Sequence, residues 1–249
     1  MSIKTILDMA REFMPDSIDE EIVDFLTRHY NTAIASPYDP HDYSNEWIDT
    51  RHKVRSWDPW VGNIENQLNY PRCVGQSWEV VARINTNNLR GADVGSGKEM
   101  ADYDAQAFYE LCKQNDGIPD ALGTYPITGA KMARKYGLTE NKPKKGEVFT
   151  IERWWRNKNV RETSNNILTT GPVALTMRIF PSFWTNKGIL KKPGSKEKST
   201  GLHNVCGTYR GDGFTSFVNS HGEHSGDFGR FIVADEFYDD YFTESIGSY

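Results

Sequence analysis

Four residues that lie far apart in this chain have the side chains that nucleophilic catalysis requires: Gln67, Cys73, His203 and Asn219. A cysteine nucleophile needs a base, and the base needs a group that orients it. Each residue also has an ordinary alternative, since most lone cysteines are small buried hydrophobes, and histidine and asparagine are common in cores and turns. Found together in the order Cys, His, Asn, they outweigh those alternatives and predict a thiol-dependent reaction.

Cys73 stands at the start of a stretch with the periodicity of a buried helix. Apolar residues recur there at the spacing of one helix face, namely Trp78, Val81 and Ile84. We expect this helix to end before the polar segment 85–99, which has the composition of a loop. A thiol at a helix N-terminus lies at the positive end of the helix dipole, which favours the thiolate. The Cys73 N–H and the Gln67 amide could both donate to a developing oxyanion.

Two strands joined by a hairpin are expected to bring the base to its orienting group. The segments 201–210 and 214–219 have strand composition and are separated by a glycine-rich turn. Adjacent antiparallel strands would place His203 and Asn219 side by side. Asn219 could then accept from one imidazole nitrogen and fix the tautomer, leaving the other nitrogen facing Cys73.

Helices dominate the first half of the sequence and strands dominate the second. Helices are predicted at 3–13, from residue 17 onward, near 104–114 and near 126–136. From about residue 146 the pattern changes to strands, and we expect an antiparallel, barrel-like sheet there. Helices followed by strands are typical of an α+β fold, here with two lobes.

We predict three parts along the chain. Residues 1–50 would form a helical extension, joined to the body by an aromatic segment that is anchored by Trp47, Trp57 and Trp60. Residues 51–165 would form a helical lobe that contains the nucleophile. Residues 166–249 would form a β lobe with His203, Asn219 and an acidic, aromatic tail that packs on a lobe or meets a partner.

Composition limits the classes of protein to which this chain can belong. Of its 249 residues, 25% are charged and 37% are hydrophobic, as in globular proteins, and the net charge of −5 gives no reason to expect nucleic acid. Three cysteines do not make a disulfide scaffold. The first residues lack the apolar core of a signal peptide, and no apolar run would span a bilayer. We therefore expect cytoplasmic synthesis, no membrane association and no cofactor.

The motifs around these residues resemble those of the papain-like cysteine peptidases over most of residues 60–234. The spacing from Gln67 to Cys73 is that of the family's oxyanion glutamine and nucleophile. Four further segments are similar to family motifs in the same order: AQAFYELC (105–112) to SEQxLxxC, GTYP (123–126) to GGYP, GPVALTM (171–177) to the central strand, and NSHGEHSGDFG (219–229) to NSWGxxWGxxG. Each motif is weak alone, but the set is specific.

The resemblance implies a role for each residue of the site. Cys73 would be the nucleophile, His203 the general acid/base and Asn219 its orienting group, with an oxyanion hole made by Gln67 and the Cys73 N–H. Gly123 and Thr124 would pair with an extended substrate backbone, as an added strand does. The pocket for the side chain two residues before the cut would be lined by Tyr125, Pro126, Thr176 and Gly201.

The sequence departs from the family pattern at four positions. A cysteine and three tryptophans are replaced by Tyr70, Val74, His221 and Ser225. The tryptophan that His221 replaces shields the His–Asn hydrogen bond from water in the family, so His221 is expected to weaken or retune that bond. His221, His224 and Asp227 also have the side chains of a zinc site, but replacement in register within the motif is the simpler account. We therefore predict no metal.

Two classes of function remain open. The first is a hydrolase that cleaves peptide bonds of a protein or of the bacterial cell wall through an acyl-enzyme at Cys73. The second is a non-catalytic binding module on the same fold. Residues 1–50 would be a pro-segment that blocks the site or a docking module. A chain with no signal and no disulfides would suit a bacterial or phage protein, carried in a virion or released by lysis.

Overall fold

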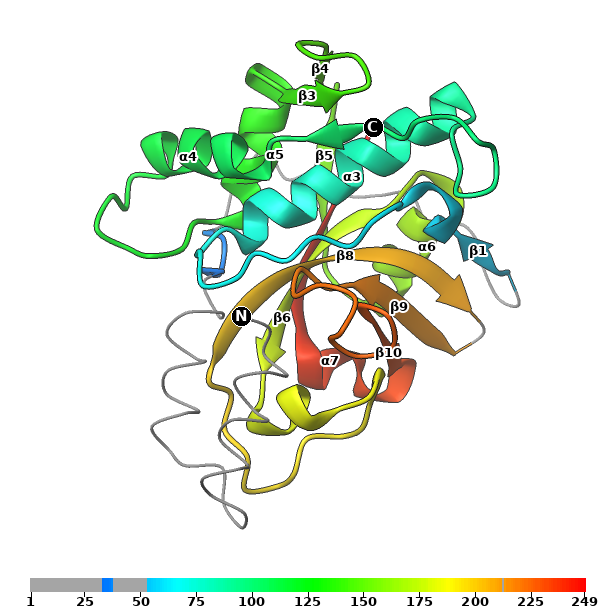
Figure 1. Cartoon of the computed structure of the whole chain (residues 1–249). Coiled ribbons are helices and arrows are strands. Elements are labelled where there is room, and N and C mark those ends of the chain that lie inside the picture. The colour runs from blue at the N-terminus through cyan, green and yellow to red at the C-terminus, as the bar shows by residue number, and fades with distance from the viewer. Residues whose placement is uncertain (1–32, 38–52, 212) are drawn as a thin grey trace, which may run out of the picture.

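The computed structural model describes residues 33–37, 53–211 and 213–249 (Figure 1). The helices predicted at 3–13 and from residue 17 lie outside the described residues, as does Trp47. Of the predicted aromatic anchors, Trp57 is buried and its indole Nε1 donates to Ile167 O at 2.8 Å.

A large sheet forms one half of the described chain. Its strands follow the order β5-β11-β6-β8-β9-β10-β7, and β1 pairs with β8. Their bounds are β1 Arg55–Ser56, β5 Trp154–Asn157, β6 Val173–Ile179, β7 Ile189–Leu190, β8 Gly201–Gly211, β9 Phe214–Val218, β10 Arg230–Ala234 and β11 Phe242–Ser248. All pairings are antiparallel except that of β10 with β7. Within the described residues, β5 and β7 are the two ends of this order and the sheet stays open rather than closing into a barrel.

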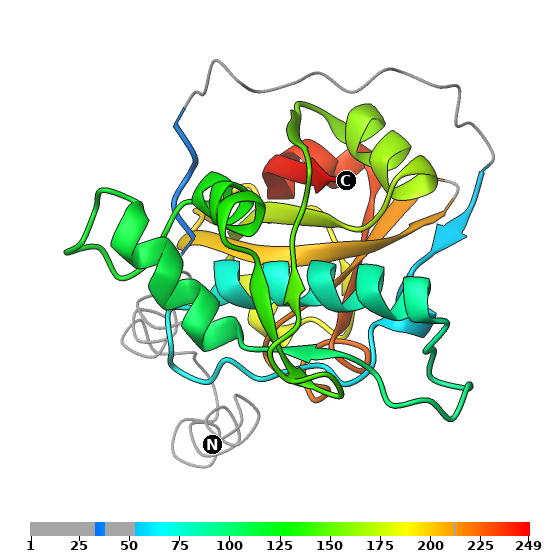
Figure 2. The same ribbon diagram turned by 90° about the horizontal axis from the view of Figure 1, so that it is seen from above.

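Helices form the other half. The helices are α3 (Cys73–Arg90), α4 (Ala105–Asn115) and α5 (Pro126–Lys135), beside a small sheet of β2 (Asp102–Tyr103), β3 (Leu138–Lys142) and β4 (Val148–Phe149). Figure 2 shows α3 on one side of β6 and β8, with α6 (Val160–Thr169) on the other side. One hydrophobic cluster joins both halves, and Trp78 of α3 and Phe217 of β9 are among its fully buried members. The α+β prediction is therefore correct.

Helix α3 is longer than the sequence pattern indicated. The segment predicted as a loop from residue 85 continues the helix to Arg90, where Gly91 closes it in the left-handed conformation with φ of 60°. Asparagine has low helix propensity, but tertiary contacts hold Asn87 in place. Its amide nitrogen donates to Trp60 O at 3.1 Å, and its oxygen accepts from Ala101 N at 2.7 Å. Both bonds join residues that are distant in the sequence, so no local pattern predicts them.

The close packing of α5 on α3 depends on a missing side chain. A Cβ added at Gly129 of α5 would lie 2.3 Å from the indole ring of Trp78. The indole Nε1 of Trp78 donates to Pro126 O at 3.3 Å. Because residue 129 is a glycine, the start of α5 can pack directly against α3. Peptide-binding residues were predicted at this helix start.

The acidic tail is part of the sheet. After the short helical turns η3 (Asp235–Phe237) and α7 (Tyr238–Tyr241), the chain enters β11, which lies between β5 and β6. The strand β5 belongs to the segment 51–165, so strands from both predicted parts contribute to one sheet. No helix of the described residues has the length and apolar character needed to cross a membrane.

Candidate active site

Cys73 is the first residue of α3, as the sequence predicts. Its side chain is buried, and Arg72, the residue before it, makes no side-chain bond to cap the helix. The helix therefore begins with main-chain N–H groups that no cap bond from Arg72 occupies, at the positive end of the helix dipole. This is the setting in which a thiolate and a developing oxyanion are stabilised.

His203 and Asn219 lie side by side, as the hairpin predicts. His203 is in β8 and Asn219 follows β9, and both are buried. His203 Nε2 lies 2.8 Å from Asn219 Oδ1, and the same oxygen accepts from Ser220 N at 2.9 Å. Because Oδ1 acts as an acceptor, Nε2 carries the proton in this bond. The lone pair of a neutral imidazole is then on Nδ1, the nitrogen able to act as a base.

One hydrogen bond sets the position of α3 along β8. Ser77 Oγ donates to Val205 O at 2.8 Å, and both residues are buried. Ser77 is one helical turn after Cys73, and Val205 shares a strand face with His203. Figure 1 shows α3 and β8 running in the same direction. The helix turn that contains Cys73 therefore faces the part of β8 that contains His203.

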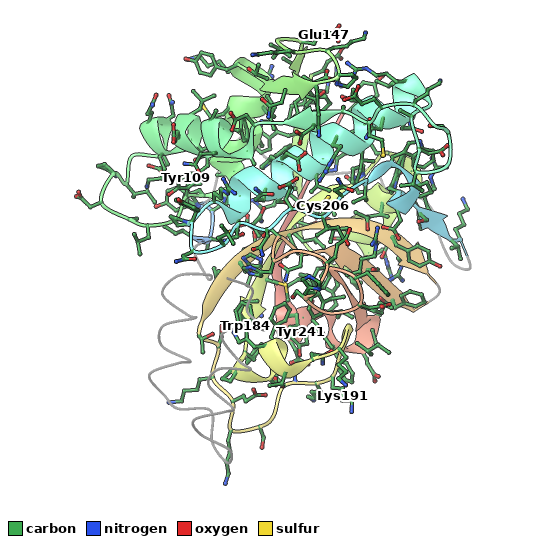
Figure 3. The ribbon with its side chains drawn as sticks, viewed as in Figure 1. Tyr109, Glu147, Trp184, Lys191, Cys206 and Tyr241 are labelled. Atoms are coloured by element: carbon green, nitrogen blue, oxygen red, sulfur yellow. The ribbon has the colours of Figure 1, made fainter. Side chains whose placement is uncertain are left out.

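A second histidine stacks on the first. The rings of His203 and His221 are 5.1 Å apart at an interplanar angle of 15°, and Trp184 contacts His221 edge-on at 5.4 Å. Trp184 belongs to the helical turn η2 (Pro181–Thr185), below β8 in the view of Figure 3. Burial, together with the nearby His203, holds the pKa of His221 well below its ordinary value. The His221 ring is therefore neutral at physiological pH.

Trp184 was not among the predicted site residues. The prediction that His221 weakens or retunes the His203–Asn219 bond rested on the loss of the tryptophan that shields this bond in the family. The ring of His221 is itself buried between His203 and Trp184. In the sequence, Trp184 is a tryptophan in an irregular segment, and nothing there indicates which distant side chain it contacts.

Gln67 is tied to the residue that follows Asn219. Its N–H donates to Ser220 O at 2.8 Å, and its side-chain oxygen accepts from Ser220 Oγ. Its Nε2 donates to Tyr70 O at 3.0 Å, which uses one of the two amide hydrogens. Gln67 is fully buried, so the asparagine motif and the loop before Cys73 are held as one unit.

The edge predicted to pair with a substrate backbone pairs with residues of this same chain. Ala33 forms a parallel bridge with Thr124 and an antiparallel bridge with Leu202, the neighbour of His203. Ala33 N donates to Leu202 O at 3.0 Å, and Ile34 N donates to Thr124 O at 3.3 Å. Residues 33–34 thus lie between the two halves of the molecule, and Leu202, which Ala33 contacts, is the neighbour of His203.

Residues 36 and 37 continue this contact. Ser36 N donates to Glu244 Oε1 at 3.0 Å, and Ser36 Oγ accepts from Ile127 N in α5 at 3.1 Å. Arg156 donates to Pro37 O at 2.8 Å. Burial raises the pKa of Glu244, although the hydrogen bond from Ser36 and the charge of Arg156 act in the opposite direction.

Glu244 is a residue of this region that sequence reasoning missed. It lies in β11 opposite Thr176 of β6, and the Thr176 hydroxyl donates to it at 3.5 Å. The alternation within FTESIGS could have indicated a strand, but the composition of the surrounding tail is that of a surface segment. Its partners are in elements remote in sequence, so no local pattern places it beside the predicted pocket.

The structure brings most of the predicted pocket residues to the same place. Gly123 and Thr124 precede α5, Pro126 is its first residue, and Gly201 begins β8 one residue before Leu202. Tyr125 is half-buried and packs against the core. Thr176 lies beside Glu244, which Ser36 contacts. Their roles in binding stay predictions. Among the residues that the structure describes, no three His, Cys, Asp or Glu side chains are grouped so as to hold a metal ion.

Comparisons with known proteins identify the fold. No known family profile and no curated protein sequence matches this chain. Among solved structures, it is similar to xylellain, a cysteine protease from Xylella fastidiosa, with a TM-score of 0.72, 13% identity and coverage of 89% of this chain and 96% of the other. It is also similar to procathepsin B S9 from Trypanosoma congolense, with a TM-score of 0.71, 12% identity and coverage of 100% and 98%.

A third similar structure is digestive procathepsin L2 from the larval midgut of Tenebrio molitor, with a TM-score of 0.70, 15% identity and coverage of 99% and 90%. At these identities the likeness concerns the fold rather than the chemistry. The chain has a papain-like fold.

Proposed function

We propose that this chain is a papain-like thiol peptidase that forms an acyl-enzyme at Cys73. The observation that carries the proposal is the buried His203–Asn219 pair at 2.8 Å, facing the helix that begins with Cys73. A nucleophile, a base and an orienting group in this relation are the requirements of acyl transfer. The papain-like fold supports the proposal by analogy.

In the proposed mechanism each group has its own step. The Cys73 thiolate attacks the peptide carbonyl and forms a carbon–sulfur bond, while the Cys73 N–H and the second Gln67 amide hydrogen stabilise the oxyanion. The His203 imidazolium gives its proton to the leaving amine as the carbon–nitrogen bond breaks. His203 then takes a proton from a water molecule, which attacks the thioester and releases Cys73. Asn219 keeps the imidazole in the tautomer that these reaction steps need.

Residues 33–37 would hold the enzyme inactive. Ala33 and Ile34 pair with Thr124 and Leu202, where an extended substrate backbone would pair. Two of the similar structures are named as procathepsins. We infer that residues 1–50 act as a pro-segment, and that a protein or cell-wall peptide replaces residues 33–34 once that segment is displaced.

Labelling with a substrate-like epoxide tests the nucleophile. We expect one modified thiol, at Cys73, in the chain without residues 1–50, and loss of labelling in His203→Ala. Burial raises the pKa of both Cys112 and Cys206, so those thiols stay protonated and unreactive. Cys112→Ala is the matched control and should label as the unsubstituted chain does. Undiminished labelling in His203→Ala would remove His203 from the role of base.

A pair of proline substitutions in the full chain tests inhibition by residues 33–37. Ala33→Pro removes the N–H that binds Leu202 O, whereas Ala35 is exposed, so Ala35→Pro is the matched control. We expect faster labelling of Cys73 in Ala33→Pro than in Ala35→Pro. Equal rates in the two variants would show that this contact does not limit access to the thiol.

The alternative is a binding module that has kept the fold and lost the chemistry. Val74 and His221 favour it, because both positions depart from the peptidase pattern. A peptide library measured with the full chain and with the chain lacking residues 1–50 separates the two functions. Binding of peptides by the shorter chain without turnover would favour the module.

A further inference from the structure

One ammonium group binds the segment that leads into Thr124 at three points. Lys113 Nζ donates to Asp116 Oδ2 at 2.9 Å, to Ile118 O at 2.8 Å and to Gly123 O at 3.0 Å. A lysine ammonium has three donors, so each of them is used. The Lys113 side chain is 16% exposed and that of Asp116 is 0% exposed, which shields the pair from solvent.

Asp116 is itself fixed by the same segment. Its other oxygen, Oδ1, accepts from Ile118 N at 2.9 Å. Burial acts to raise the pKa of Asp116, but the hydrogen bonds from the Ile118 N–H and the Lys113 ammonium outweigh it and hold the pKa below its ordinary value. The carboxylate therefore stays charged at neutral pH and keeps the ammonium in place.

The anchors of this segment come from one face of α4. Tyr109 and Lys113 are four residues apart, so their side chains lie on the same face. Tyr109 Oη donates to Leu122 O at 2.5 Å, while Lys113 binds the next carbonyl, that of Gly123. Tyr109 lies on the helical half of the molecule in Figure 3. Two successive turns of α4 thus fix the carbonyls of Leu122 and Gly123, the two residues that precede Thr124.

We propose that Lys113 is a positioning residue for peptide binding. By holding the Gly123 carbonyl, it keeps Thr124 in register with an extended chain that lies between Thr124 and Leu202. The role of Lys113 in binding a substrate rests on the proposed function. Its role in positioning Thr124 for the chain's own residues does not, because Thr124 O already accepts from Ile34 N at 3.3 Å.

Hydrogen exchange in the full chain tests the positioning without requiring catalysis. In Lys113→Met, the amide of Ile34 should exchange at least about tenfold faster, since loss of one charge-assisted anchor corresponds to about a tenfold change in an equilibrium. Amides of β9, which is remote from this segment, should keep their rates. Lys192→Met is the matched control, because Lys192 is an exposed lysine of a surface loop.

Two further variants keep the test decisive if Lys113→Met folds poorly. Lys113→Met with Asp116→Asn removes the buried charge together with its partner, and should accelerate exchange at Ile34 as Lys113→Met does. Lys113→Arg keeps the charge and a donor for Asp116, and should give an intermediate rate. Unchanged exchange at Ile34, or an equal increase in β9, would overturn the positioning role.

Steady-state kinetics gives a second measurement. In the Ala33→Pro background, Lys113→Met should raise KM about tenfold and leave kcat nearly unchanged, because the Thr124 edge binds substrate and transition state alike. A fall in kcat with constant KM would contradict the proposal. If neither the Ala33→Pro chain nor the chain lacking residues 1–50 cleaves peptide, the proposed function fails, while the exchange result still decides the role of Lys113.

Discussion

The carboxyl of Glu79 gives a pH dependence of stability that can be worked out from the structure. It lies within α3, its side chain is 1% exposed, and it pairs with Arg83 at 2.9 Å. Burial raises its pKa from 4.5 to about 7, although the positive charge of Arg83 acts in the opposite direction. Between these two values the folded chain keeps a proton that the unfolded chain has released.

The sign and size of the effect follow from that difference. Below pH 4.5 the carboxyl is protonated in both states, so its contribution to stability is fully present there, and it is lost as the pH rises through about 7. Each unit of pKa difference is worth about 1.4 kcal/mol. This group alone should therefore lower the free energy of unfolding by about 3 kcal/mol across the interval.

Urea unfolding at several pH values from about 4.5 to 8 would measure this slope. Glu79→Gln cannot titrate, so its unfolding free energy should vary less over that range than that of the unsubstituted chain. Glu152→Gln is the control, because Glu152 is exposed. A Glu79→Gln variant with the original slope would refute the assignment, as would a Glu152→Gln variant that loses the slope.

Two other substitutions test the packing and charge pairs of the helical half. Gly129→Ala should destabilise the fold by about 1–3 kcal/mol, because the new Cβ would lie 2.3 Å from the Trp78 ring. A similar decrease of the denaturation midpoint in Gly95→Ala, where the atom nearest to the new Cβ is 3.4 Å away, would contradict this prediction. Arg90→Met should cost about 3–5 kcal/mol at neutral pH, because it removes bonds of 2.6 and 2.7 Å to Glu140, whose side chain is 0% exposed. Adding Glu140→Gln should recover part of that loss, and no loss at all in Arg90→Met would refute the role of the pair.

Local patterns predicted the elements that carry the candidate site. The apolar spacing after Cys73 indicated a helix, and the strands around His203 and Asn219 indicated a hairpin, which the structure contains. The length of α3 was wrong because the buried side chain of Asn87 is held by Trp60 and Ala101, which no local pattern reveals. The predicted division of the chain into 1–50, 51–165 and 166–249 stays a prediction.

The sequence by itself determined the chemical groups of the site and their order along the chain. Cys73, His203, Asn219 and Gln67 could be selected because their types and spacing correspond to a known chemistry. Side-chain type and hairpin geometry are local properties, and they follow from a few consecutive residues.

Only the tertiary structure decided what surrounds those groups. It placed Trp184 against His221, Glu244 against Ser36, and residues 33–34 between Thr124 and Leu202. Each of these contacts joins segments that are remote in sequence, and its free energy depends on burial and on distances that exist only after the chain has folded. The sequence thus predicted a nucleophile and its base, whereas the fold decided that the neighbouring edge, predicted to bind peptide, is occupied by the chain itself.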